Sequence, residues 1–211
     1  MIASALLKSL AIAGLLATSA YGAPEFDLDL DLETRDDLPD GYTEVPVEWE
    51  VQAFPGGDAL QLNGTIEKIH AQLLELNPNY DTDFPVLVDD EDSIEARAPC
   101  NAGWHHTRCN TNRNKAKLQA INNGIKYLRS KAGRPSLPAG PGKCGRVSCS
   151  YNSGIWWCND YNHRHTLGSY NSIAKGARCI ANKCASTSSN TLKGQTFAKG
   201  SKWNVMPNSH C

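Results

Sequence analysis

Five histidines in the second half of the chain could carry acid–base or metal chemistry: His105, His106, His163, His165 and His210. Imidazole titrates near neutral pH, so two of them acting with a lysine could cleave RNA. His105 or His106 could instead join His163 and His165 in a copper or zinc site. Both chemistries require separate loops to meet in space. The interpretation that we favour is that these histidines are exposed residues of polar loops.

Carboxylates are almost absent from the same half. Between Ala98 and Cys211 the only acidic side chain is Asp160, whereas glycosidases usually need two carboxylates. The serine-hydrolase pattern GxSxG, the metalloprotease pattern HExxH and a glycine-rich phosphate loop do not occur. The sequence therefore assigns no catalytic residue, cofactor or metal, and it favours a binding protein over an enzyme.

The cysteines also lie in this half, and their number is even: Cys100, Cys109, Cys144, Cys149, Cys158, Cys179, Cys184 and Cys211. An even count in a short secreted domain predicts a framework of up to four disulfides. Eight cysteines allow 105 pairings, so the connectivity stays open. Because no CxxC pair occurs, a structural zinc site is disfavoured.

Charge divides the chain at the same boundary. Residues 23–97 hold 21 Asp and Glu but only Arg35, Lys68 and Arg97 as basic residues, a net charge of −18. Residues 98–211 hold 17 Lys and Arg against one acid, a net charge of +16. Such asymmetry between halves indicates two segments with different roles.

These boundaries predict a secreted precursor. Residues 1–22, with Lys8, a short apolar run and a small-residue exit, are typical of a signal peptide and too short to span a bilayer. Arg97 stands where the charge changes sign, and we predict proteolytic processing after it. The products would be an acidic pro-segment, 23–97, and a basic disulfide-rich domain, 98–211.

The acidic pro-segment divides into two parts. Residues 23–45 are rich in Asp and Leu, a composition that predicts disorder. Residues 46–77 alternate apolar and polar positions around a Pro-Gly-Gly-Asp turn and then change to helical spacing after Thr65, which predicts a ββα unit. Asn63 begins an Asn-Gly-Thr sequon and is a predicted glycosylation site.

The basic domain shows helical spacing over 110–133 and again over 169–184. Strand patterns occupy 146–151 and 155–158, then 195–197 and 203–206, and a loop is expected over 136–145. The expected fold is α+β: a small, disulfide-rich antiparallel sheet with two helices on one face. Basic residues on and near the first helix should form a cationic surface: Lys115, Lys117, Lys126, Arg129 and Lys131.

Tryptophans in a small disulfide-rich domain usually lie in the core, and we assign Trp157 and Trp203 to it. Trp104 and Trp156 are left open, because tryptophans interleaved with basic residues could also stack on bases or sit at a membrane interface.

Three stretches carry a family resemblance: KCGRVSCSYNSGIWWCND, SYNSIAKGARCIANKC and a later GQTF. They resemble fungal small secreted cysteine-rich proteins, a group of candidate effectors. The stretch LNGTIEKIHAQLLELNPNYDTDF is similar to the pro-segments of that group, so the likeness spans about Trp49 to Cys211. The order of elements is also similar to the α/β-sandwich killer toxins of fungi, which implies a ferredoxin-like sheet.

The function expected from charge and resemblance together is that of a secreted cationic effector or toxin with a role in virulence. It would bind an anionic cell surface, cell wall, membrane or foreign-cell receptor after the acidic pro-segment is removed. Nucleic acid ranks below these partners. The alternatives are a membrane-active antimicrobial protein and a secreted ribonuclease-like toxin. The pro-segment would either mask the basic surface or serve only as a solubilising leader.

Overall fold

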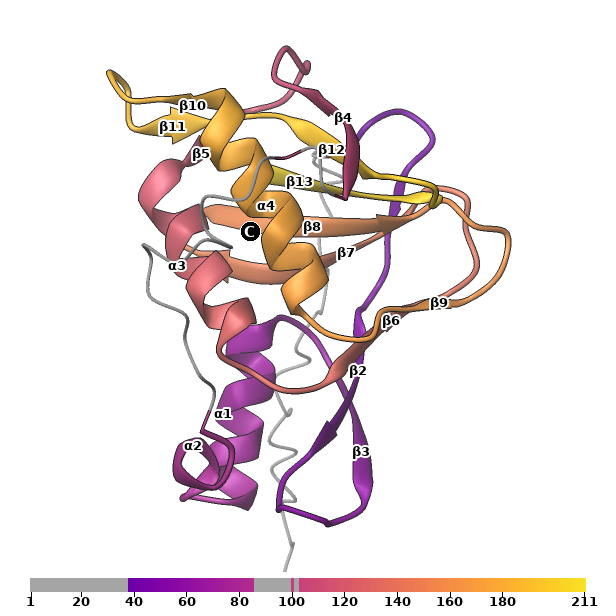
Figure 1. The fold of residues 1–211 in the computed structure, drawn as a ribbon, viewed down its shortest axis with the longest axis vertical. Helices are drawn as coiled ribbons and strands as arrows, with labels where there is room; N and C mark the ends of the chain where they lie inside the picture. Colours follow the sequence, from indigo (N-terminus) through magenta and orange to yellow (C-terminus); the bar gives the residue numbers. More distant parts are fainter. Residues whose placement is uncertain (1–37, 86–99, 101–102) are drawn as a thin grey trace, which may run out of the picture. The chain divides into compact units, whose positions relative to one another are not determined.

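The computed structural model describes residues 38–85, 100 and 103–211 (Figure 1). The predicted signal peptide (1–22), the processing position Arg97 and residues 23–37 lie outside the described residues. No described helix is long and apolar enough to cross a membrane. The fold is α+β, with four helices and three sheets among the described residues.

The largest sheet has the strand order β1-β7-β8-β13-β12-β4. Its bounds are β1 (Thr43–Glu44), β4 (Trp104–Arg108), β7 (Lys143–Ser150), β8 (Ser153–Asn159), β12 (Gln195–Ala198) and β13 (Trp203–Ser209). Strand β1 runs parallel to β7, and the other neighbours in this sheet are antiparallel. Tyr151 and Asn152 both have positive φ at the end of the β7–β8 hairpin, as a two-residue type I′ turn requires.

Helices α3 (Leu118–Arg129) and α4 (Asn171–Cys184) cover one face of this sheet, as expected (Figure 1). Each presents an apolar stripe to the sheet because its buried residues recur at helical spacing. The stripes include Ile121, Ile125 and Leu128 on α3 and Ile173 and Ile180 on α4. Strand side chains alternate between faces, so Trp157 points to the helices and Trp156 to the opposite face.

Two smaller sheets complete the fold. One has the order β3-β2-β6-β9, with β2 (Glu48–Gln52), β3 (Ala59–Asn63), β6 (Arg134–Leu137) and β9 (His165–Thr166). The other has the order β10-β11-β5, with β5 (Ala116–Lys117), β10 (Ala185–Ser186) and β11 (Thr191–Leu192). Helices α1 (Ile66–Leu76) and α2 (Tyr80–Asp83) follow β3.

Strands β2 and β3 and helix α1 lie where the alternating and then helical pattern over 46–77 predicts a hairpin and a helix. Their apolar side chains belong to the same core as the helices α3 and α4: Val47, Trp49, Val51, Ile66, Ile69 and Leu73 are all buried in it. The described part of the acidic half, residues 38–85, is called the acidic segment below. It is part of the hydrophobic core of this protein rather than an appendage.

Several predicted boundaries differ from the structure. The helix expected over 110–133 begins only at Leu118, because β5 pairs with β11 immediately before it. The loop expected over 136–145 is interrupted by the end of β6 and the start of β7. Residues 38–45, expected to be disordered, contain β1, and Leu38 and Tyr42 pack on the sheet face opposite the helices.

Four disulfides join all eight cysteines, which confirms the predicted framework and supplies the connectivity: Cys100–Cys179, Cys109–Cys184, Cys144–Cys158 and Cys149–Cys211. The first two tie the chain around β4 to helix α4, the third joins β7 to β8, and the fourth fixes the C-terminus to β7. Each bond lies within residues 100–211, so no disulfide attaches the acidic segment to the basic domain.

Candidate functional site

The acidic segment lies against the basic domain through paired charges. Glu48 accepts hydrogen bonds from both terminal nitrogens of Arg164, at 2.6 and 3.0 Å. Glu44 pairs with Arg146 at 2.7 Å. The local cause is strand pairing, since β2 lies antiparallel to β6 and β1 lies parallel to β7. The outward residues of these strands therefore face arginines of the basic domain: Arg146 lies on β7, and Arg164 directly precedes β9, which pairs with β6.

A carboxylate of helix α1 extends this contact into the main sheet. Glu67 accepts a hydrogen bond of 2.6 Å from the Ser148 hydroxyl and bonds of 3.2 and 3.3 Å from the backbone N–H of Cys149. Ser148 is buried, so the half-buried carboxylate of Glu67 satisfies a hydroxyl that has little access to water. The basic domain thus holds an anion at this point of β7.

A fourth cluster joins the two halves beside helix α3. His70 contacts the Tyr127 hydroxyl through Nδ1 and lies 2.9 Å from Asp81 Oδ1 through Nε2. The Lys131 ammonium donates to the same carboxylate oxygen at 2.6 Å. The hydrogen bond from Lys131 is the main cause of the lowered pKa of Asp81, with a further contribution from His70. The cluster holds one carboxylate between a lysine and a histidine.

The five residues predicted to form a cationic surface differ in their exposure, and one of them belongs to this cluster. Lys115, Lys117 and Lys126 are exposed, and Arg129 is half-buried. Lys131, expected on the surface, has a side chain only 11% exposed because Asp81 and His70 cover it. The sequence could not place Lys131 there, since helical spacing does not reveal what packs on the polar face of a helix.

The histidines of the basic domain do not assemble as a metal site would require. His105 and His106 stack on each other on exposed positions of β4. The rings of His163 and His165 each lie 4.8 Å from the Tyr161 ring. Burial lowers the pKa of His165, and His163 lowers it further. Within the described residues, no three His, Cys, Asp or Glu side chains gather in metal-binding geometry, so the proposed copper or zinc grouping is not formed.

The single carboxylate of the basic domain has a structural role. Asp160 accepts a 2.8 Å hydrogen bond from the side chain of Asn204 and a 3.2 Å bond from the backbone of Gly142. Tyr42 of the acidic segment also donates to it, at 3.4 Å. Burial, followed by the charge of Asp160, raises the pKa of Tyr42. Asp160 is therefore engaged in a polar network.

The tryptophans are core residues. Trp157 and Trp203 are buried as predicted, and Trp156, left open, is buried in the opposite face of the sheet. Trp104 is partly buried and packs edge-on against Trp203, with ring centres 5.1 Å apart. Among the described aromatic residues of the basic domain, Tyr151 is the large side chain that remains exposed.

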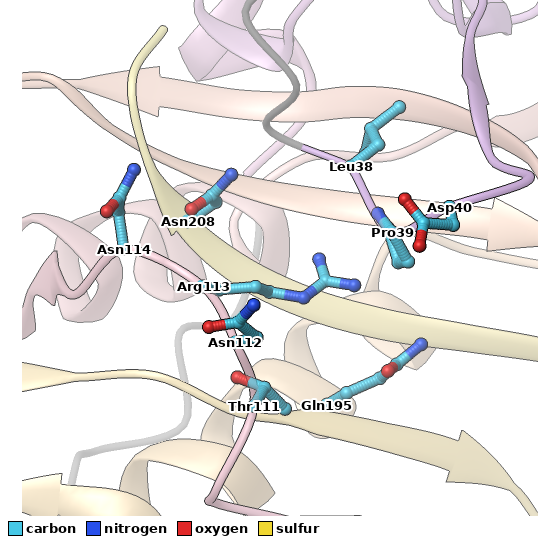
Figure 2. A pocket seen from close by; sticks show the side chains of 9 residues that line it. All are labelled: Leu38, Pro39, Asp40, Thr111, Asn112, Arg113, Asn114, Gln195 and Asn208. Carbon is cyan, nitrogen blue, oxygen red and sulfur yellow. The ribbon is translucent and has the colours of Figure 1, made fainter.

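A polar cleft of about 440 Å³ was not predicted. A single loop between β4 and β5 supplies four of its residues, and β12, β13 and the acidic segment supply the rest (Figure 2): Leu38, Pro39, Asp40, Thr111, Asn112, Arg113, Asn114, Gln195 and Asn208. The loop residues fall within the stretch predicted as helix. The signal that could have found them is the unbroken polar run Asn110–Asn114, which lacks the apolar positions of a helix.

No protein-family model matches this chain, and neither a curated protein nor a solved structure matches it. The fold and cysteine pairing define the class of the molecule as an α+β, disulfide-rich protein. Four disulfides are typical of proteins that fold in an oxidising compartment, as secreted proteins do.

Proposed function

We propose that this chain is a secreted cationic effector or toxin-like protein, and that its acidic segment occupies the basic surface until the protein reaches its target. The observation that carries the proposal is the set of carboxylates placed on cations of the basic domain. Glu44, Glu48 and Glu50 pair with Arg146, Arg164 and Arg134, and Asp81 pairs with Lys131. The target would be an anionic surface, since it must replace these carboxylates.

Processing after Arg97 belongs to the same proposal. A cut there leaves no covalent bond between the two halves, because every disulfide lies within residues 100–211. The shared core still holds the segment, with Trp49 and Ile69 fully buried in it. Cleavage alone therefore leaves a two-chain complex, and an anionic surface or a fall in pH completes the release.

While the acidic segment is in place, binding at a surface is favoured over insertion into a membrane; its release would uncover apolar side chains that it now buries, such as Tyr170 against Trp49. Insertion needs exposed apolar side chains on the active domain. The described residues include three exposed large hydrophobic side chains, and two of them, Phe54 and Leu76, belong to the acidic segment. Only Tyr151 belongs to the basic domain. The ribonuclease alternative needs RNA cleavage that is lost when His163 and His165 are replaced.

The killer-toxin resemblance and the ferredoxin-like arrangement remain part of this proposal. Helix α3, the hairpin β7–β8 and helix α4 follow one another in the order that the resemblance implies. Strand β8 lies between β7 and the C-terminal β13. The strands of this sheet that precede α3, which are β1 and β4, lie at its two edges.

Retention of the full-length chain on a heparin column, read as the salt concentration of elution, tests the masking. The variant Glu48→Gln/Glu50→Gln frees two arginines, and Asp58→Asn/Glu75→Gln is its matched control. The control removes the same charge from exposed carboxylates that pair with no described cation. Masking predicts later elution of the first variant than of the control. Equal elution of both would mean that the segment acts only through net charge.

A further inference from the structure

Arg113 is the one cation among the described residues that line the cleft in Figure 2, and it is partly buried. Its side chain crosses the cleft, with the guanidinium directed toward Pro39 and Asp40. No described carboxylate forms an ion pair with it, and its hydrogen-bond contact is the sulfur of the buried Met206. Burial lowers the pKa of Arg113 to about 10, so the group stays protonated at neutral pH. A partly desolvated cation without a counter-charge is costly unless an anion completes it.

The other cleft residues of the basic domain are neutral and polar, whereas the acidic segment contributes Leu38, Pro39 and Asp40. Asn112 from the same loop, Gln195 and Asn208 lie around the Arg113 side chain, and Asn114 lies near its backbone end. Amide side chains both donate and accept hydrogen bonds, which suits hydroxyl groups. The Thr111 hydroxyl oxygen is buried and has no hydrogen-bond partner among the described residues. Such an atom can accept a hydrogen bond from a ligand.

The combination of one guanidinium with several amides selects a ligand class. A guanidinium binds a carboxylate through two parallel hydrogen bonds. The described lining offers one cation, which matches the single charge of a carboxylate better than the two charges of a phosphate dianion, and the amides can hydrogen-bond to sugar hydroxyls. The volume of about 440 Å³ falls within the range of small-ligand sites.

We propose that this cleft binds a uronic acid residue of an acidic polysaccharide, with its carboxylate on Arg113 and its hydroxyls on the amides of Asn112 and Asn114. This inference deepens the proposed function, since it rests on an anionic surface as the target and names the chemistry of that surface. Asp40 lines the cleft from the acidic segment without forming an ion pair with Arg113, so the proposed site is that of the chain before the segment is released.

The test is calorimetric titration of the full-length chain with a trimer of galacturonic acid, compared with the methyl-esterified trimer. We expect the acid trimer to bind. The ester should bind at least about tenfold more weakly than the acid, because a hydrogen-bonded charge is lost. Arg113→Gln should weaken acid binding about tenfold or more. Lys115→Gln, the matched loss of one exposed positive charge two residues away, should change it less than about twofold.

Equal affinity for acid and ester, or equal loss in both variants, would overturn the inference, and so would the absence of binding to the wild-type chain. If Arg113→Gln does not fold, Asn112→Ala replaces it, together with the NMR signal of the Arg113 Nε–H in the wild-type chain. That signal must shift on titration with the acid trimer. Because the uncut chain is used, failure here leaves the heparin result untouched, and failure of masking leaves this titration untouched.

Discussion

Glu48 and Arg164 form a bidentate ion pair, with Oε2–Nη1 at 2.6 Å and Oε1–Nη2 at 3.0 Å, across 116 residues of sequence. Both side chains are more than a third exposed, so the pair adds little to overall stability. Its two parallel hydrogen bonds fix the relative orientation of the two side chains and therefore the register of β2 against the basic domain. The pair therefore aligns the acidic segment on the basic domain, while buried side chains hold it there.

The first prediction concerns the chain cut after Arg97. Because the halves share a core and no disulfide, we expect one species in gel filtration at neutral pH and two in denaturing, non-reducing electrophoresis. Intact mass before and after reduction checks both the cut and the four bonds. Two separate species already present in native gel filtration would contradict the shared core.

Replacing Trp49 with alanine should destabilise the full-length chain. The indole is fully buried, packs edge-on against Tyr170 with ring centres 4.6 Å apart, and donates to the Gly64 carbonyl at 2.5 Å. We expect a loss of about 3–5 kcal/mol in the free energy of unfolding, measured with urea. Phe54→Ala, at a side chain 53% exposed in the same segment, is the control and should change it by less than about 1 kcal/mol. A small effect of both would place the segment outside the core.

Gly145 should prove sensitive to a single added methyl group. A Cβ there would lie 2.2 Å from Val47 Cγ2 and 2.9 Å from Leu137 Cδ2. We expect Gly145→Ala to lower stability by about 1–3 kcal/mol. Adding Val47→Ala should recover part of the loss by making room. Gly103→Ala, where a Cβ meets nothing within 4 Å, should be neutral in the same urea titration.

The attachment of the segment should weaken in acid. Hydrogen bonds from Arg164 and Lys131 are the main causes of the lowered pKa values of Glu48 and Asp81, whose ordinary values are 4.5 and 3.8. Such carboxylates stabilise the complex above those values, and the contribution is lost as the pH falls through the lowered ones.

We therefore expect the affinity between the halves of the cut complex to stay level from about pH 8 to pH 5 and to fall modestly below about pH 4, measured by gel filtration of diluted samples. Glu48→Gln should make the dissociation depend less on pH. Release between pH 8 and 6 instead would contradict the role given to the carboxylates.

The sequence by itself determined the local elements and the division of charge. Alternation around Trp157 and helical spacing around Ile125 reflect burial on one side, and both were predicted because that periodicity depends on neighbouring residues alone. The even cysteine count predicted the disulfides but not their partners. The polar run around Arg113 was misread as the start of a helix.

Only the tertiary structure decided what covers each buried face. Strand β2 pairs with β6 some eighty residues later in the chain, and Lys131 lies beneath Asp81. The cleft at Arg113 also includes residues of β12 and β13, which follow it in the chain by more than eighty residues. A periodic pattern shows that a side must be buried but carries no information about its partner, because that choice is made by shape and charge between distant segments.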